Sequence, residues 1–502
     1  MIRLLNHPVR GHDAPSMTDS LLEDLALNDL LDRYFEEPAA ILTRDAQALR
    51  ERNQVLRDIR RHPNLAAAFC AARDALAALP ETAGTLDADP ILVLANLGCI
   101  RTAQTALKGL EAALGAVGAD ACSAMQALRQ SLSQSIAEAF PPDTEATWAE
   151  YAGGADFPGS VTYKIRFTDR AQIESVALQK VERREERRMA WPWQKSPART
   201  MRRKAFVLQP DTRRTPGTGY DPTGSLGGMQ RLKVALDRLL GAQAAAARPK
   251  IRAAALRLHA RYARLLAELD FFVRACGLVE ALEACGYPLT FAEINASMED
   301  PVALEGLYHP ALAIQRQGPI TLNRLRADNG RHVVLLGGYN RDGKTTYLRA
   351  VGAIQVLFQM GLPVPASQAA LYPVASLVSA FAKAERTELT CGKLGQELEA
   401  VRQALERMAE DGLILFNEPI SGTSPKESVA LSREILCVLL ARRQRGLWVT
   451  HLFPLFDEAE RLGKILGGSE VLCMRTRQDD PNAPPFSVHE GMPAYDSGAR
   501  KV

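Results

Sequence analysis

The first 140 residues repeat apolar and polar positions with the period of an amphipathic α-helix. From residue 17 to about 140, aliphatic side chains recur three or four positions apart, which is the spacing of one helical face. The pattern is clearest at Leu107, Leu110, Leu114, Leu128 and Leu132. Pro141 and Pro142 interrupt it, because proline lacks a backbone N–H group and clashes with the preceding turn. We predict successive helices up to residue 140.

The pattern changes in the middle of the chain. Apolar residues alternate with polar ones over residues 161–167, which predicts a β-strand, and residues 205–208 offer a partner strand. Residues 209–228 are rich in proline, glycine and threonine and predict a flexible connection. Residues 229–285 return to helical spacing, with Pro249 as the expected break in a long helix.

Beyond residue 300, short apolar runs alternate with helical segments. The runs at 332–336, 412–416 and 447–450 each have the length of a buried strand, and residues 347–358 follow the first of them with helical spacing. Strands that alternate with helices are typical of a parallel α/β sheet. We predict such a domain for the C-terminal part of the chain.

Composition excludes several classes of protein. The 502 residues, at roughly 100–200 per domain, suggest about three domains, and 61 basic against 58 acidic residues exclude a polycation. The first 19 residues contain no apolar core of a signal peptide, and the most apolar stretch, 91–100, is half the length needed to cross a bilayer. Eight cysteines without a C-x-x-C pair and eight histidines without H-x-x-x-H or H-E-x-x-H spacing argue against a disulfide framework and a protein-built metal site. We expect a cytoplasmic protein without membrane contact.

A glycine-rich loop follows the strand at 332–336. Residues 338–345 fit the pattern G-x-x-x-x-G-K-[ST], with a strand before and a helix after. Glycines let the backbone N–H groups of such a loop surround a phosphate at a helix N-terminus. Lys344 is the expected ligand of the β- and γ-phosphates, and Thr345 the expected Mg²⁺ ligand. The nucleotide-binding residues predicted here are Gly338, Asn340, Gly343, Lys344, Thr345 and Thr346.

Two further strand ends carry polar residues suited to the same chemistry. The strand at 412–416 runs into Asn417 and Glu418, and the strand at 447–450 ends at His451. A carboxylate after such a strand holds Mg²⁺ or polarises the attacking water, and a histidine there can reach the γ-phosphate. We predict Glu418 and His451 as catalytic residues.

At this point the sequence resembles the MutS family of DNA mismatch-repair ATPases, within the ABC-type ATPases. Residues 338–349 resemble the family's G-P-N-x-x-G-K-S-T-Y-[ML]-R, and residues 361–366 resemble G-x-x-V-P-A. Residues 417–424 are similar to D-E-x-x-x-G-T-S, residues 449–451 to A-T-H, and residues 307–310 to the R-H-P that opens the ATPase domain.

The resemblance implies a fold class and a domain order. It implies an α/β P-loop (ABC-type) ATPase domain at the C-terminus, an all-α core and lever N-terminal to it, and a small basic insertion with short strands. The expected segments are an N-terminal helical segment at 1–40, a helical core at 41–150, a basic insertion and connector at 151–228, lever helices at 229–299 and the ATPase domain at 300–502.

Two elements of the family pattern are missing. Only some 40 residues precede the helical core, and they contain no F-x-E wedge of the mismatch-reading domain. The chain also ends soon after residues 486–493, which look like the last ATPase strand, so the C-terminal helix-turn-helix is absent from it. We therefore expect no mismatch recognition by a wedge.

Two departures fall inside the expected ATPase site. Asn417 stands where the family has an acidic Mg²⁺-coordinating residue, so it can contact the ion through water but brings no negative charge. The signature-loop serine of the family falls on Gly392, with Thr390 and Lys393 nearby. We expect binding of ATP and Mg²⁺ with slow hydrolysis. Because ABC-type sites close between two facing domains, the resemblance also implies a homodimer or a partner with a similar domain, and we favour the homodimer.

A basic segment lies in the expected insertion. Residues 180–204 contain ten lysines and arginines against three glutamates, a net charge of +7. The candidates for contact with double-stranded or branched DNA are Arg183, Arg184, Arg187, Arg188, Arg202, Arg203 and Lys204. Arg257, Arg261 and Arg264 form a second basic face at helical spacing. The alternative is a solvated charged surface.

The favoured function is a MutS-like ATPase that works as a dimeric, DNA-associated clamp. Two alternatives remain open. One is an ABC-type ATPase whose helical half grips a protein or RNA, and the other is a nucleotide-gated scaffold that does not hydrolyse ATP, which Asn417 and Gly392 favour.

Overall fold

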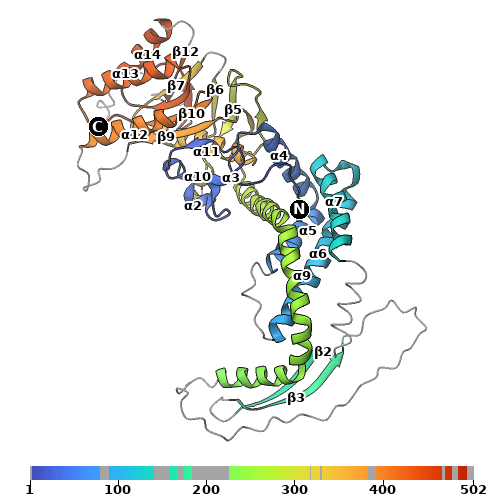
Figure 1. The fold of residues 1–502 in the computed structure, drawn as a ribbon. Coiled ribbons are helices and arrows are strands. Elements are labelled where there is room, and N and C mark those ends of the chain that lie inside the picture. The colour runs from blue at the N-terminus through green and yellow to red at the C-terminus, as the bar shows by residue number, and fades with distance from the viewer. Residues whose placement is uncertain are drawn as a thin grey trace. The chain divides into compact units, whose positions relative to one another are not determined.

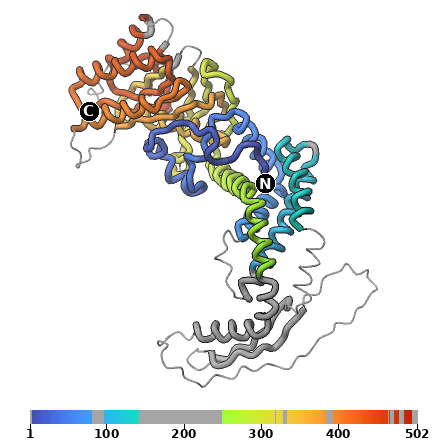
Figure 2. Tube along the Cα trace, viewed as in Figure 1, coloured from blue at the N-terminus to red at the C-terminus, as the bar shows by residue number. Residues whose placement is uncertain are grey.

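The chain forms two compact units, each described here by itself (Figures 1 and 2). The computed structural model describes residues 3–79, 90–140, 158–167, 173–183, 225–316, 318–327, 331–382, 392–465, 470–477 and 484–493. Unit 1 comprises Met1–Ile2, Ala71–Ala116 and Leu128–Leu266, and unit 2 comprises Arg3–Cys70, Val117–Ala127 and Ala267–Val502.

A seven-stranded sheet is the centre of unit 2. Its strand order is β1-β9-β10-β11-β7-β12-β13, and every neighbouring pair is parallel except β12 and β13. The strands are β1 Ser16–Met17, β7 Arg331–Gly337, β9 Ser376–Phe381, β10 Gly412–Asn417, β11 Arg445–Val449, β12 Glu470–Thr476 and β13 Val488–Glu490. The prediction of a parallel α/β sheet is confirmed, and all its strands except β1 come from residues 331–490.

Helices pack on both faces of this sheet because its strands are apolar on both sides. The helices are α11 Lys344–Met360, α12 Lys393–Arg407, α13 Pro425–Ala441 and α14 Pro454–Ile465. On β10, Ile414 and Phe416 belong to the core cluster shared with α12, α13 and α14. Leu415 between them points the other way and lies against Gly352 of α11, as expected when successive strand residues face opposite sides.

A second, four-stranded sheet of order β4-β8-β5-β6 lies before and between these elements in sequence. Its strands are β4 Glu293–Ile294, β5 Val302–Leu307, β6 Asn323–Ala327 and β8 Gln368–Leu371, and the short helix α10 Pro310–Gln315 follows β5. Along the chain, β4, β5 and β6 lie between the long helix α9 Ser225–Glu283 and β7, and β8 follows β7.

The N-terminal segment completes the large sheet at one edge. Besides the short helices α1 Leu21–Asp24, α2 Asn28–Leu31 and α3 Pro38–Ile41, it forms the strand β1, which pairs with β9 in register Ser16 to Ser376. The Ser379 hydroxyl donates to Asp24 Oδ2 at 2.8 Å. Sequence analysis predicted helices here and missed the strand, because two residues show no readable alternation.

A buried arginine joins this segment to the sheet domain. Arg52, on α4 Ala46–Arg61, is 1 % exposed and donates to the backbone oxygens of Val9 at 2.9 Å, Ile41 at 2.7 Å and Met360 at 3.1 Å. Burial lowers the pKa of its guanidinium to about 10. Met360 ends α11, so the cation lies at the negative end of that helix dipole.

A glycine makes this approach possible. Gly361 follows α11 with a left-handed φ of 78°, and a Cβ atom on it would lie 2.7 Å from the Cβ of Arg52. Any side chain there would push α4 away from the end of α11, since real Cβ contacts are longer than this. The close packing of the two helices therefore depends on both residues.

Unit 1 consists mainly of long helices. It contains most of α6 Pro90–Val117 and α7 Ser123–Ala139, and part of α5 Pro63–Ala77 and of α9 Ser225–Glu283. The hydroxyls of Ser135 and Tyr262 lie 3.0 Å apart, and Arg261 donates to the Ser135 oxygen at 3.0 Å and pairs with Glu138 at 2.9 Å. The side chain of Arg261 therefore binds α7, so Arg261 is not available to the basic face predicted with Arg257 and Arg264. The predicted helices up to residue 140 are confirmed within the described residues.

Two details of the middle segment differ from the sequence prediction. The helix α9 is continuous through Pro249, so the expected break there is wrong. The strand predicted at 161–167 lies within β2 Pro158–Phe167, and its antiparallel partner is β3 Ile173–Arg183. Residues 205–208, offered as the partner, lie outside the described residues. Within the described ranges, every helix is too short or too polar to span a bilayer.

Replacing Arg52 by alanine should strongly destabilise unit 2. The change empties a buried site and leaves three carbonyl groups without their donor, which should lower the free energy of unfolding by about 3–5 kcal/mol. Urea denaturation followed by circular dichroism measures the change. Arg50→Ala, on the exposed side of the same helix, is the control and should stay within about 0.5 kcal/mol of wild type. Equal stability of the two variants would contradict the anchoring role of Arg52.

Candidate active site

Three neighbouring strands of the large sheet end at the same edge and carry the predicted site residues. In the ladder, Val449 of β11 pairs with Leu336 of β7 on one side and with Asn417 of β10 on the other. Parallel strands place their carboxyl ends together, and ligands of α/β proteins bind at that edge. The loops after β7, β10 and β11 therefore converge.

The loop after β7 turns sharply into α11 because two glycines allow it. Gly338 and Gly343 have φ angles of 157° and 87°, and Gly343 is the N-cap of α11. A Cβ atom on Gly338 would lie 1.9 Å from the Thr476 hydroxyl, so only glycine fits. The loop thus leaves its N–H groups at the N-terminus of a 17-residue helix, which is a favourable place for an anion.

Lys344 lies over this loop. It is 6 % exposed, and its ammonium donates to the backbone oxygens of Gly338 at 2.7 Å and Tyr339 at 2.8 Å. Burial lowers the pKa of Lys344, while the carboxylates of Glu418 and Asp342 favour its charged form. The lysine is held at the loop by carbonyl groups, which is the position needed to meet the outer phosphates of a nucleotide.

Asp342 braces the loop, a role that sequence analysis missed. Its Oδ2 accepts from the Tyr339 N–H at 3.1 Å and from the Thr476 hydroxyl at 3.0 Å. Thr476 is the last residue of β12, the strand on the far side of β7. The sequence could have indicated this role, because Thr476 is one more polar residue at the end of a strand next to β7.

Thr345 and Asn417 lie side by side. The Thr345 hydroxyl donates to Asn417 Oδ1 at 3.1 Å, so the two predicted Mg²⁺ ligands come together from α11 and β10. Both present an oxygen, the atom that Mg²⁺ prefers, and the ion usually keeps several waters. The pair fits a hydrated Mg²⁺ ion, although it supplies no negative charge.

Glu418 and His451 form an ion pair next to this oxygen pair. Glu418 has a left-handed φ of 51°, and its N–H group donates to the Val449 oxygen at 2.9 Å. Its carboxylate Oε2 contacts His451 Nδ1. The hydrogen bond to Glu418 raises the pKa of His451, against a smaller lowering by burial. A non-glycine residue in this conformation is costly, and such residues are frequent at functional sites.

The loop after β7 and the end of β10 line a pocket of about 520 Å³. The predicted residues Asn340 and Thr346 are part of that lining. Tyr308, Ile320 and Phe486 also line the pocket, and the sequence did not predict this role for them. The pocket combines a phosphate-sized cradle with apolar and aromatic side chains, which suits a nucleotide better than a free phosphate.

His309 also lines the pocket, and its ring is engaged in the fold. Its Nδ1 accepts from the Leu312 N–H at 3.3 Å, so Nε2 carries the proton and donates to the Leu25 oxygen at 2.8 Å. Burial lowers the pKa of His309 to about 4. The neutral ring connects the N-terminal segment to the start of α10.

The segment after Glu418 is held by a buried carboxylate. Glu397 on α12 accepts from the Ser421 N–H at 2.9 Å and the Gly422 N–H at 2.8 Å, and also from the Ser421 hydroxyl. Gly392 is the N-cap of α12 and Lys393 is its first residue, whereas Thr390 lies outside the described residues.

Of the candidate DNA-binding residues, the structure describes Arg183 alone. Arg183 is the last residue of β3. Arg184, Arg187, Arg188, Arg202, Arg203 and Lys204 lie outside the described residues. The predicted contact with DNA therefore rests on the sequence alone.

Most of the sheet domain matches the model of a known protein family. The family model of MutS domain V matches residues 334–480. The chain is similar to the Endonuclease MutS2 of Thermus thermophilus, with 32 % identity over 26 % of this chain and 18 % of the relative. It is also similar to the DNA mismatch repair protein MutS of Thermus aquaticus, with 31 % identity over 41 % of this chain and 24 % of the relative. The chain thus spans about a fifth to a quarter of the length of these curated relatives.

The pKa of His451 should depend on Glu418. Because the carboxylate favours the protonated imidazole, Glu418→Gln should lower the pKa of His451, and an NMR titration of the ring protons measures this. The stability gained from the pair should be complete below the unfolded pKa of about 6.5 and lost as the pH rises through the higher folded value. Glu410→Gln, an exposed carboxylate, is the control. An unchanged titration in Glu418→Gln would refute the coupling.

Proposed function

We propose that this chain is an ATPase that binds ATP with Mg²⁺, hydrolyses it slowly and acts as a dimeric clamp on DNA. The match of residues 334–480 to MutS domain V and the similarity to MutS and MutS2 proteins support the proposal. The observation that carries the proposal is the convergence of three strand ends at one edge of the sheet, with the Thr345–Asn417 oxygen pair at the pocket and the Glu418–His451 ion pair beside it. The proposed reaction is the hydrolysis of ATP, which releases its γ-phosphate.

Each residue has a role that its position supports. The Lys344 ammonium and the loop N–H groups bind the phosphates at the N-terminus of α11, except those of Tyr339 and Asp342, which are bonded within the loop. Thr345 and Asn417 hold the Mg²⁺ ion, which neutralises phosphate charge when bound. Glu418 accepts the proton of the attacking water, and His451 orients its carboxylate through their ion pair.

Asn417 explains why we propose slow turnover. Phosphoryl transfer depends on positioning and on charge stabilisation around the metal ion. An amide at this position accepts hydrogen bonds from metal-bound water but contributes no charge, so the ion is held more weakly than by an aspartate. A nucleotide-gated scaffold that does not hydrolyse ATP is the second candidate, and the same substitution favours it.

Asn417→Asp should raise the ATPase rate. The added carboxylate strengthens binding of the metal ion next to the phosphates, and we expect about a tenfold increase in kcat, which corresponds to about 1.4 kcal/mol. Steady-state phosphate release at saturating ATP measures it. Lys344→Ala should abolish nucleotide binding, whereas Lys426→Ala, an exposed lysine in the first turn of α13, should leave it unchanged.

The outcomes separate the two candidates. Slow phosphate release by the wild type that disappears in Glu418→Gln supports the ATPase. No release by the wild type, with ATP binding intact, supports the scaffold. An ATPase rate that is already high and that Asn417→Asp leaves unaltered would refute the role given to Asn417.

The DNA part of the proposal rests on charge. The +7 segment at 180–204 is long enough to follow several phosphates, and binding to phosphates is independent of base sequence. We propose recognition of DNA structure rather than of mismatches, because contacts with phosphates position a protein on the duplex without reading its bases. The alternative is that this segment binds an RNA or a protein instead of DNA.

DNA binding should weaken steeply with salt and should be indifferent to mismatches. The combined replacement of Arg184, Arg187 and Arg188 by alanine should reduce the slope of log K against log[salt] by about 2–3, because each phosphate contact contributes about 0.9. Fluorescence anisotropy with paired, mismatched and branched DNA measures this salt dependence. Sedimentation in the presence of ATP measures the number of chains and should show two per complex. The matched control removes three exposed charges elsewhere, at Arg50, Lys426 and Arg433. Equal slopes in both triple variants, or no binding at low salt, would contradict the proposal.

A further inference from the structure

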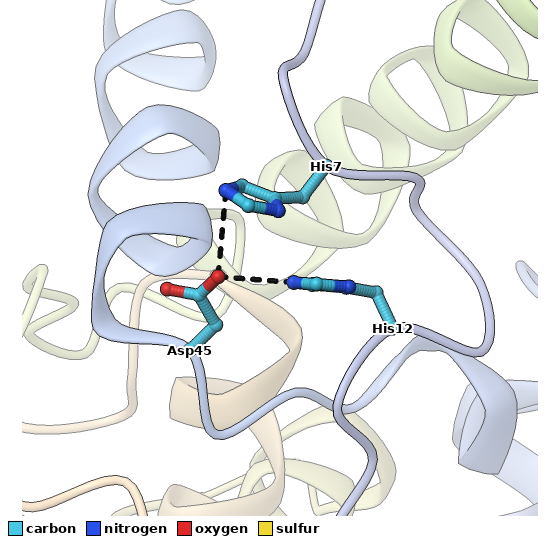
Figure 3. Close-up of side chains that lie close together, drawn as sticks. All are labelled: His7, His12 and Asp45. Carbon is cyan, nitrogen blue, oxygen red and sulfur yellow. Dashed lines mark hydrogen bonds and ion pairs between the residues drawn. The ribbon is translucent and has the colours of Figure 1, made fainter.

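Two histidines and an aspartate of unit 2 meet outside the nucleotide site (Figure 3). His7 and His12 belong to the irregular segment that precedes β1, and Asp45 is the N-cap of α4. The Nε2 atoms of His7 and His12 lie 3.5 Å and 3.0 Å from Asp45 Oδ2. Figure 3 shows both rings directing a nitrogen at the same carboxylate oxygen.

The helix fixes the carboxylate in this position. Asp45 Oδ1 accepts from the N–H groups of Gln47 at 2.8 Å and Ala48 at 3.3 Å. The two oxygens of Asp45 thus have separate tasks, since Oδ1 caps α4 and Oδ2 faces the histidines. A carboxylate whose second oxygen is held by backbone groups is a pre-oriented ligand.

The separations within the cluster match those of a tetrahedral metal site. Zinc lies about 2.0–2.1 Å from a histidine nitrogen and about 2.0–2.2 Å from a carboxylate oxygen. Two ligands at these lengths and a tetrahedral angle are about 3.3 Å apart, and the two observed separations of 3.0 Å and 3.5 Å lie on either side of that value. Neutral imidazole and carboxylate are a donor set that suits first-row divalent metals.

Solvent can reach the cluster. The side chains of His7, His12 and Asp45 are 34 %, 29 % and 22 % exposed. The rings are stacked with centroids 4.3 Å apart and planes 23° apart, so they must turn about their side-chain torsions to aim both lone pairs at one ion. Their partial exposure permits this turn and leaves the fourth position to water.

We propose that His7 Nε2, His12 Nε2 and Asp45 Oδ2 bind one divalent transition-metal ion of the Zn²⁺ class. The ion ties the segment around residues 7–12 to the start of α4. That helix carries Arg52, whose guanidinium contacts both Val9 of this segment and Met360 at the end of α11. The metal therefore strengthens the attachment of the N-terminal segment to the sheet domain. Histidine spacing along the sequence gave no sign of the site, because its third ligand lies 33 residues further on.

The test measures Zn²⁺ binding to the full chain after treatment with a chelator. Competition with a chromogenic chelator should show one saturable site per chain, and Co²⁺ should give the visible absorption bands of a tetrahedral N/O site. His7→Gln and His12→Gln should each weaken Zn²⁺ binding at least tenfold. Asp45→Asn should do so as well, and asparagine keeps the helix cap. Zn²⁺ should raise the Tm of the wild type and not that of these variants.

Controls make the result decisive. His62→Gln removes a histidine at the opposite end of α4 and should leave the affinity for Zn²⁺ unchanged. Circular dichroism and nucleotide binding establish that each variant is folded. Absence of a saturable site in the wild type would overturn the proposal, and so would equal affinity in the wild type and in the combined His7→Gln, His12→Gln variant. Both outcomes are independent of whether the chain hydrolyses ATP.

Discussion

The contact between Arg52 and the carboxyl end of α11 is the constraint on which unit 2 depends. One guanidinium satisfies carbonyl groups from three separate stretches of chain, and burial of a charge is tolerated only when it is compensated by such hydrogen bonds. The same helix α11 begins at the phosphate loop. The N-terminal segment is thereby attached to the helix whose other end faces the nucleotide pocket.

The pocket itself follows from strand order. Because β10, β11 and β7 are adjacent and parallel, residues that are remote in sequence come together at one edge without any long loop. Glu418 is further constrained by its left-handed backbone and its bond to Val449, which directs the carboxylate toward His451 rather than along the strand. Rigid strands thus position the chemistry, and Glu397 extends that rigidity to residues 421 and 422.

Sequence reasoning succeeded where the pattern is local. The phosphate loop, the strands that become β7, β10 and β11, and the polar residues at their ends are contiguous signals, and the structure brings them together as expected. It failed where the partner is distant. The strand β1 is only two residues long, and Thr18 meets Ser379 across 361 residues. A buried arginine such as Arg52 contradicts the usual exposure of charged residues, so composition and periodicity could not identify it.

The edge position of β1 has a consequence for how the chain folds during synthesis. This strand is made before its partner β9, which follows all the residues of unit 1 in the chain. Pairings of such long sequence separation form slowly, whereas the last residue of unit 1 is Leu266, well before β9. We expect the helical unit to form on the ribosome while the N-terminal segment waits for the sheet that it will border.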